Sequence, residues 1–291
     1  MPLPPRPLAV EPDPFRSAVP APPLALRACA RTDVGRERAR NEDRVGFLDL
    51  DAGRAYEPPS EAELPLAHGP VVLVVCDGMG GEAGGQIASS LAIASIARGL
   101  VARHHARALA DADALGVGCV ETLLDASAQV RAVGTAEPRY ARMGTTATVA
   151  ALVGDTVVCA QVGDSRAYLV RANGELVRLT RDQTFLELVR AAGGGPPIDA
   201  DGSPIGANVI LQAVGSSNAL DVVLTRATVA TGDALLVCSD GLHGVVDDRT
   251  LARVLRETRA VSVAADALVA LALEAGAPDN VSCAVARVVR R

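Results

Sequence analysis

Asp77 is the first residue whose position suggests chemistry, because it directly follows the apolar run 71–76 and precedes a glycine-rich turn. An apolar run without alternation is typical of a strand buried on both faces, and such a strand would project the Asp77 carboxylate from its tip. The glycines that follow would let the backbone turn tightly and come close to whatever Asp77 holds. The stretch also fits an ordinary turn with an acid near a helix start, so residues elsewhere must decide.

Two more acids repeat this arrangement. Asp240 follows the apolar run 235–238 after one serine, and Asp279 precedes the apolar run that begins at Val281. Each acid alone is commonly a turn residue, but several carboxylates at strand ends repel one another unless a hard divalent cation binds them. Oxygen-only ligands favour Mg²⁺ or Mn²⁺, and the four histidines lack the spacing of zinc ligands.

The elements that must position these acids follow from periodicity. Residues 146–153 and 156–162 are two apolar runs joined by Gly154 and Asp155, which predicts an antiparallel hairpin. Both runs are apolar on successive residues, as antiparallel strands are only when both faces are covered, so we expect two packed sheets with helices outside. Further strands are expected over 24–30, 45–50, 71–75, 166–170, 176–179, 222–228, 234–238 and 281–289, and helices over 86–105, 114–133, 184–192, 249–257 and 262–275.

Three stretches are expected to lie outside these elements. Residues 1–23 hold nine of the eighteen prolines and are expected to form a disordered arm, or a short ligand for a partner. Residues 51–69 are expected to form a surface loop, and residues 193–218, rich in Gly, Pro, Ser and Asn, a mobile flap. Residues 24–291 otherwise show no domain boundary.

Composition excludes several classes of protein. The net charge of −6, the absence of Trp and the three Phe and three Tyr give no basic surface and little base stacking for nucleic acid. All 28 basic residues are Arg, which excludes lysine chemistry. The six cysteines stand singly, as expected in a reducing compartment, and we find neither a membrane-spanning run nor a signal-peptide core, so we expect a cytoplasmic protein with no membrane span.

Six short motifs together resemble those of the metal-dependent serine/threonine protein phosphatases of the PP2C type, bacterial branch, over residues 24–287. Each motif is weak alone, whereas their order and spacing are highly specific. The resemblance implies an α+β fold, a four-layer αββα sandwich of two antiparallel sheets flanked by helices, with a pair of Mg²⁺ or Mn²⁺ ions at one end. The motifs are Arg38-x-x-Asn41-Glu42-Asp43, Asp77-Gly78-Met79-Gly80-Gly81, Met143-Gly144-Thr145-Thr146, Gly163-Asp164-Ser165-Arg166, Ser239-Asp240-Gly241 and Asp279-Asn280.

The resemblance implies a metal-binding role for five residues. Asp77 would bridge both ions and Gly78 would lend its carbonyl oxygen. Asp240 and Asp279 would complete the shell of one ion. Asp164 resembles the ligand that, with Asp240, forms a third, weaker metal site in bacterial relatives.

It also implies roles for the Arg38 motif. Glu42 and Asp43 would act through metal-bound waters. Arg38 would hold the phosphate, since a guanidinium matches phosphate oxygens with paired hydrogen bonds and keeps its charge. Met79 departs from the family pattern, because eukaryotic members often carry there a His proposed as general acid.

The implied activity is hydrolysis of phosphoserine and phosphothreonine in proteins by a water that two metal ions activate, reversing serine/threonine kinase signalling. The expected partners of this monomer are phosphoproteins, including a serine/threonine kinase and its substrates. The sequence lacks the residues that other phosphatase mechanisms need. No Cys has an Arg six positions later, as a cysteine-based phosphatase requires, and residues 49–53 lack the Thr of a phosphoaspartate motif. A non-catalytic phosphoprotein-binding relative and a hydrolase of a small phosphoester remain as alternatives.

Overall fold

The computed structural model describes residues 23–81, 83–195, 198, 205–206, 209–216 and 219–291. The expected arm, residues 1–23, therefore lies outside the described residues except for Pro23, as does much of the expected flap at 193–218.

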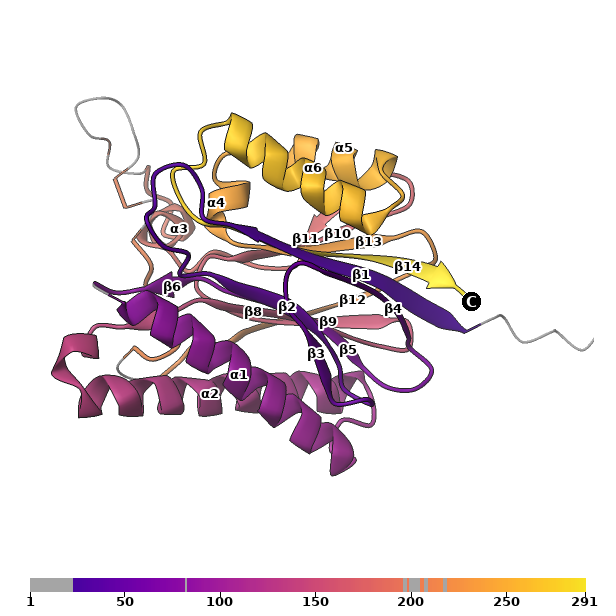
Figure 1. Cartoon of the computed structure of the whole chain (residues 1–291), viewed down its shortest axis with the longest axis horizontal. Coiled ribbons are helices and arrows are strands. Elements are labelled where there is room, and N and C mark those ends of the chain that lie inside the picture. Colours follow the sequence, from indigo (N-terminus) through magenta and orange to yellow (C-terminus); the bar gives the residue numbers. More distant parts are fainter. Residues whose placement is uncertain (1–22, 82, 196–197, 199–204, 207–208, 217–218) are drawn as a thin grey trace, which may run out of the picture.

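Two six-stranded antiparallel sheets lie face to face (Figure 1). The first sheet contains, in spatial order, β11 (Leu176–Arg178), β10 (Arg166–Val170), β13 (Ala234–Cys238), β14 (Val281–Arg290), β1 (Leu24–Asp33) and β4 (Ser60–Pro65). The second contains β12 (Val223–Thr228), β9 (Thr156–Val162), β8 (Ala147–Val153), β5 (Val71–Cys76), β2 (Arg44–Asp49) and β3 (Arg54–Tyr56). A separate short ladder joins β6 (Gly78–Met79) to β7 (Gly144–Thr145).

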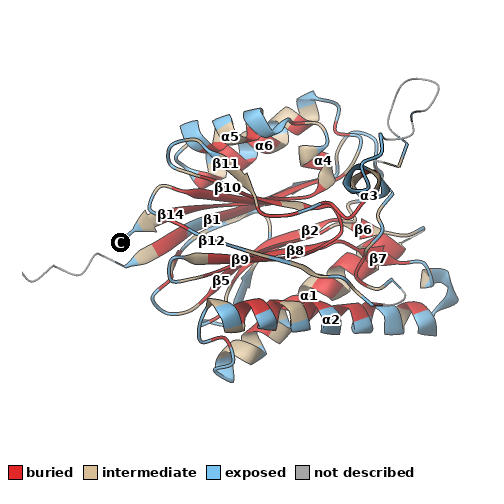
Figure 2. Cartoon of the chain, turned by 180° about the vertical axis from the view of Figure 1, so that it is seen from behind, coloured by how far each residue is buried: buried red, intermediate tan, exposed pale blue. Residues whose placement is uncertain are grey.

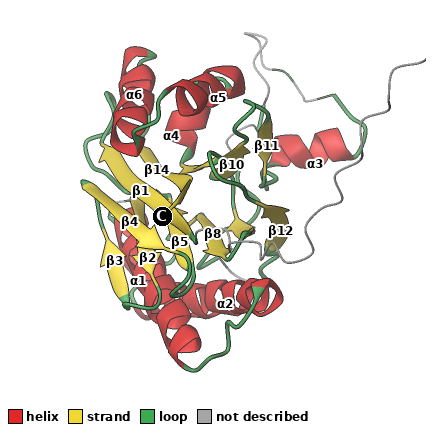
Figure 3. Cartoon of the chain, turned by 90° about the vertical axis from the view of Figure 1, so that its right-hand side faces the viewer, coloured by secondary structure: helices red, strands yellow, loops and turns green. Residues whose placement is uncertain are grey.

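Helices cover the outer face of each sheet, so that the chain forms four layers, seen end-on in Figure 3. The second sheet is covered by α1 (Gly84–His105) and α2 (Ala112–Ala136), and the first by α5 (Asp248–Glu257) and α6 (Val261–Glu274). This arrangement confirms the expected αββα sandwich. The short helices are η1 (Pro138–Tyr140), α3 (Phe185–Ala191) and α4 (Asp240–His243).

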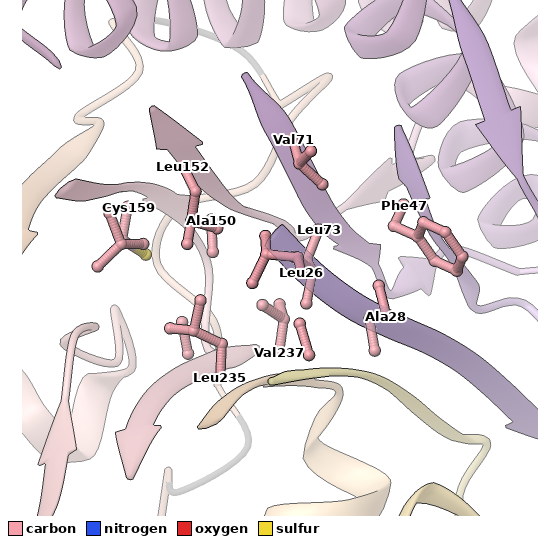
Figure 4. Close-up of a cluster of buried hydrophobic side chains, with 14 of the residues drawn as sticks. Leu26, Ala28, Phe47, Val71, Leu73, Ala150, Leu152, Cys159, Leu235 and Val237 are labelled. Atoms are coloured by element: carbon pink, nitrogen blue, oxygen red, sulfur yellow. The ribbon is translucent and has the colours of Figure 1, made fainter. Parts of the chain in front are cut away.

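Buried apolar side chains form three clusters: one between the two sheets, one between the second sheet and helices α1 and α2, and one between the first sheet and helices α5 and α6. These clusters explain why the strands are so uniformly apolar. All six residues of β5 are buried. Val71, Leu73 and Val75 face the cluster between the sheets, which Figure 4 shows in part, whereas Val72 and Val74 face α1 and α2. Figure 2 shows the same burial on the sheet-facing sides of the helices. The hairpin of β8 and β9 is likewise covered on both faces, as the sequence predicts.

The prediction that residues 51–69 form a surface loop is wrong, because this stretch contains β3 and β4. Both are edge strands: among the described residues, β3 pairs only with β2, and β4 only with β1. An edge strand has one partner and can leave much of its surface in water. In β4, residues 60–63 alternate between half-buried and exposed, and only Leu64 is buried. Such strands need no apolar run, and the sequence therefore gives little sign of them.

By length and composition, α1 is apolar enough to cross a membrane. It nevertheless packs against the second sheet and α2, and its buried residues include Ala88, Ala92, Ile96 and Leu100. The described part of 193–218 also contacts the domain: Thr145 and Val214 form a β-bridge.

Candidate active site

The register of β2 and β5 sets Asp43 beside Asp77. The two strands are antiparallel, and Arg44 of β2 lies opposite Cys76 of β5. Asp43 directly precedes β2 and Asp77 directly follows β5, so both acids leave the second sheet at the same end. Asp43 retains only 2% of its surface exposed.

The first sheet delivers two acids to the same region. Cys238 of β13 lies opposite Cys283 of β14, so the end of one strand meets the start of the other. Asp240 begins α4 two residues after the end of β13, and Asp279 lies two residues before β14. Both acids line one cleft with Asp77, at the end of the sandwich where β6 and α4 lie (Figure 1).

Asp164 reaches this end of the first sheet from a third strand. Arg166, the first residue of β10, lies opposite Cys238, and Asp164 precedes it by two residues. Asp164 is buried, with 5% of its surface exposed, and its carbonyl oxygen lies 3.1 Å from Nε2 of His243 in α4.

The five acids form one electrostatic cluster. Removal from water is the largest cause that raises the pKa of Asp77 well above its ordinary value. The same cause, followed for Asp164 by the charge of Asp240, raises the pKa of Asp43 and of Asp164 to about 7 each. A cation among these carboxylates would relieve their repulsion. The other acids whose charge raises the pKa of Asp77 are Asp43, Asp240, Asp164 and Asp279.

Three carboxylate oxygens in this cluster lack a hydrogen-bond partner. They are the buried Oδ1 atoms of Asp43, Asp164 and Asp240. Buried polar atoms are nearly always hydrogen-bonded, and unpaired carboxylate oxygens are the ligands that Mg²⁺ and Mn²⁺ prefer, so these residues fit a divalent-cation site. Within the described residues, however, no three His, Cys, Asp or Glu side chains are already grouped to hold an ion.

The backbone at Asp77 is held firmly. Its N–H donates to Oγ1 of Thr146 at 2.9 Å, and its carbonyl oxygen accepts from the N–H of Thr146 and from Oγ1 of Thr145, each at 2.8 Å. At Gly78, a Cβ atom would lie 2.2 Å from the carbonyl oxygen of Gly85 in α1. A side chain at this position would clash with the backbone of α1, so glycine is required.

Arg38 lies at the mouth of the cluster, with 54% of its side chain exposed. Its Nη2 donates to Oδ2 of Asp279 at 2.5 Å. Glu42 lies nearby, and although burial raises its pKa, the charge of Arg38 and a hydrogen bond from the Gln86 backbone oppose that shift.

Asn280 has a positioning role that the sequence did not reveal. Its side-chain Nδ2 donates to the carbonyl oxygens of Val34 and Arg40, at 2.8 and 2.9 Å, and its Oδ1 accepts from the N–H of Glu42 at 2.8 Å. One buried amide thus fastens the loop that carries Arg38 to the start of β14. The sequence signals are its place in the Asp279-Asn280 motif and a polar residue directly before an apolar strand.

Ser239 is a second such residue, and it links the two sheets. Its Oγ donates to Oδ2 of Asp43 at 2.7 Å and accepts from the N–H of Ser282 at 3.1 Å. Asp43 therefore keeps one oxygen hydrogen-bonded and leaves Oδ1 without a partner.

An open cleft of about 640 Å³ lies at this end of the sandwich. Six of the residues singled out from the sequence line it: Arg38, Glu42, Asp77, Gly78, Asp240 and Asp279. Of the residues singled out from the sequence, Asp43 lies buried behind this cleft and Asp164 lines an adjoining one. The remaining lining residues are Ala39, Arg40, Met79, Gly80, Gly81, Ile210 and Asn280.

Comparison with known proteins agrees with this geometry. The model of the protein phosphatase 2C family matches residues 65–274. The serine/threonine phosphatase stp of Listeria monocytogenes is 30% identical over 257 residues, which are 88% of this chain and 94% of that protein. The chain therefore belongs to the protein phosphatase 2C family.

A longer relative is the serine/threonine protein phosphatase PstP of Mycobacterium tuberculosis. It is 35% identical over 273 residues, or 91% of this chain, and the match spans 46% of its own length. The crystal structure of the Mycobacterium tuberculosis serine/threonine phosphatase PstP/Ppp has a TM-score of 0.70 at 32% identity and covers 92% of this chain and all of that one. The catalytic domain of serine threonine protein phosphatase PstP in complex with two manganese ions has a TM-score of 0.68 at 33% identity, covering 91% of this chain and 99% of that one.

Proposed function

We propose that this chain hydrolyses phosphoserine and phosphothreonine in proteins at the cleft around Asp77. The observation that carries the proposal is the convergence of five acids, from the ends of strands in both sheets, beside the guanidinium of Arg38. The names of the Listeria and mycobacterial relatives, both serine/threonine phosphatases, support it.

Two divalent cations are part of this proposal, with Mn²⁺ supported by the relative that is described in complex with two manganese ions. Asp77, the carbonyl oxygen of Gly78, Asp240 and Asp279, which line one cleft, would hold these ions. Asp164, together with Asp240, offers a third position. Two such ions would lower the pKa of a water molecule and neutralise charge on the transferred phosphoryl group.

The protein's own groups orient the reaction. Arg38 would bind two phosphate oxygens through its planar guanidinium, exchanging the carboxylate of Asp279 for the phosphate. Ser239 fixes the orientation of Asp43, and Asn280 fixes the backbone of Glu42, so that both carboxylates would act through water from a set position. Met79 carries no proton to give, so the leaving group must be protonated by another group.

The proposed substrates are phosphoproteins, and the proposed partners are a serine/threonine kinase and the proteins it phosphorylates. We further propose that the chain acts as a monomer in the cytoplasm. Its six cysteines are all buried and none forms a disulfide, as expected in a reducing compartment.

The proposal is tested by assaying the purified chain on a phosphothreonine peptide and on a small phosphoester, with Mn²⁺, with Mg²⁺ and with a chelator. We expect release of phosphate from the peptide with either ion and none with the chelator. Phosphate release from the small ester alone would instead make the chain a small-molecule phosphatase. No release from either compound would favour a phosphoprotein-binding protein without catalysis.

A further inference from the structure

A second hollow adjoins the candidate active site on the other side of Met79, which lines both. Its volume is about 580 Å³. We name it the Arg131–Arg142 groove after the two cations that line it. The other lining residues are Gly134, Thr135, Pro138, Ala141, Met143, Gly144, Ala213, Gly215 and Ser216.

The floor of the groove is a hydrogen-bonded structure. Met79 of β6 pairs with Gly144 of β7, and the next residue of β7, Thr145, forms a bridge with Val214. Thr145 and Val214 exchange both backbone hydrogen bonds, at 3.0 and 2.8 Å. The N–H of Gly215 then donates to Oγ of Ser127 in α2 at 3.0 Å. Three extended segments thus form a fixed surface that continues from the β6 backbone beside Asp77.

This surface combines an apolar floor with a basic rim. Met143 and Ala213 are buried, with 5% and 7% of their surface exposed. Arg131 near the end of α2 and Arg142 before β7 are both exposed. An extended polypeptide could lie on the floor while its acidic side chains meet the two guanidinium groups.

Both guanidinium groups are available. None of the residues that line the groove is acidic. Among the described residues, neither the Arg131 nor the Arg142 guanidinium has an ion-pair or hydrogen-bond partner. Glu137, the acid that lies between them in the sequence, is paired with Arg139 at 2.7 Å.

A third hollow also adjoins the candidate active site, and Asp240 and Asp279 line both. Its charge differs from that of the Arg131–Arg142 groove. It has a volume of about 760 Å³, and its lining contains acids as well as arginines. Each of its arginines is already paired with an acid. They form ion pairs as follows: Arg38 with Asp279, Arg166 with Asp182, and Arg190 with Glu187.

We propose that the Arg131–Arg142 groove binds the acidic flank of the phosphoprotein segment whose phosphoresidue enters the cleft, an inference that rests on the proposed function. The ligand chemistry is a cluster of carboxylates or a second phosphate, each of which matches a guanidinium with paired, charge-assisted hydrogen bonds. The two arginines thereby set substrate preference without taking part in the chemical step.

A kinetic comparison tests the groove. Phosphothreonine peptides with flanking Ala, with flanking Asp and with a second phosphothreonine are compared at saturating Mn²⁺, in the wild type, in the double variant Arg131→Ala/Arg142→Ala, and in Arg253→Ala. Arg253 is the matched control, because it is exposed on α5 and likewise has no partner among the described residues. We expect the wild type and Arg253→Ala to prefer both acidic peptides about fivefold in kcat/KM through a lower KM, and the double variant to lose that preference.

The two acidic peptides separate the sources of charge. Preference for both supports a site for anionic side chains in general, and preference for the doubly phosphorylated peptide alone supports a second phosphate site. No preference in the wild type, or an equal preference in the double variant, would overturn the proposal.

A binding experiment separates failure of the groove from failure of the proposed function. A fluorescent, unphosphorylated peptide rich in Asp is titrated with the full chain, and its anisotropy is measured at low and at high salt. We expect the double variant to bind it about fivefold more weakly than wild type at low salt, with the difference fading at high salt. This holds even if no peptide is hydrolysed, whereas equal binding by both proteins would exclude the groove even if phosphatase activity is found.

Discussion

Arg38 donates from Nη2 to Oδ2 of Asp279 over 2.5 Å, so the residue proposed to bind phosphate is held by a residue proposed to bind metal. The contact joins the loop before β2 to the loop before β14, which are 241 residues apart in the sequence. If Arg38 binds the substrate phosphate as proposed, phosphate and Asp279 would compete for one guanidinium, and phosphate binding would depend on the charge of Asp279.

Replacing Arg38 with Ala should weaken phosphate binding more than metal binding. We expect the inhibition constant of free phosphate to rise about tenfold or more, because a bidentate charged contact is lost. The Mn²⁺ concentration that gives half-maximal activity should change far less. Arg36→Ala is the control, since Arg36 is exposed in the same loop and does not line the cleft. Unchanged inhibition by phosphate would assign that role to another arginine.

Asn280→Ala should lower both stability and activity. The substitution leaves the carbonyls of Val34 and Arg40 and the N–H of Glu42 without the partner they now share, which we expect to reduce the free energy of unfolding by about 2–4 kcal/mol. Denaturant unfolding measures this. Asn173→Ala is the matched control and should cost little. Asn173 is exposed, and within the part of the chain that the structure describes its side chain accepts only a local hydrogen bond, from the N–H of Glu175. If both variants unfold at the same denaturant concentration, Asn280 does not hold the loop.

Gly78→Ala should be far more harmful than Gly81→Ala. A Cβ at Gly78 would lie 2.2 Å from a backbone oxygen of Gly85, whereas one at Gly81 would have no atom within 4 Å. We expect the first variant to lose about 2 kcal/mol or more in unfolding free energy, together with activity, and the second to melt near the wild-type temperature. Equal melting temperatures would show that β6 can move away from α1.

Divalent cations should stabilise the fold most at neutral pH. Because burial raises the pKa of Asp43 and Asp164 to about 7, above the ordinary value of 3.8, these acids favour the folded state when protonated. That stability is fully present below pH 3.8 and is lost as the pH rises to about 7. Mn²⁺ should offset the loss, since a ligand that binds only the folded state raises the melting temperature.

The measurement is the melting temperature against pH, with Mn²⁺ and with a chelator. We expect the two curves to separate as the pH rises from about 5 to about 8, and Asp240→Asn to narrow the gap. Curves that stay parallel over this range would contradict the assignment of the acid cluster as the cation site.

Local patterns in the sequence predict most of this fold. The residues of β5 and of the hairpin β8–β9 are apolar without interruption, so these strands must be buried on both faces. In the structure one face packs against the other sheet and the other face against α1 and α2. The sequence does not predict the edge strands β3 and β4. A strand with one partner and much of its surface exposed to solvent does not require an unbroken apolar run. An apolar run shows that a strand is buried but not which strand lies beside it.

The candidate site is harder to predict for the same reason. Acids at strand ends can be found one by one, but only the pairing of Arg44 with Cys76 places Asp43 beside Asp77. Ser239 and Asn280 belong to the motifs that carry the resemblance, but the sequence assigns them no role, since their hydrogen bonds reach residues 196 and 238 positions away.

The central claim, that strand-end acids hold the catalytic ions, is tested most directly by the phosphatase rate of Asp240→Asn on a phosphothreonine peptide at saturating Mn²⁺. Asp155→Asn is the control, because Asp155 is an exposed turn residue between β8 and β9, where the strands leave the opposite end of the second sheet. We expect Asp240→Asn to keep its circular dichroism spectrum and lose at least about a hundredfold in rate, with the control near wild type. A folded Asp240→Asn protein that retains more than about a tenth of the wild-type rate would contradict the account.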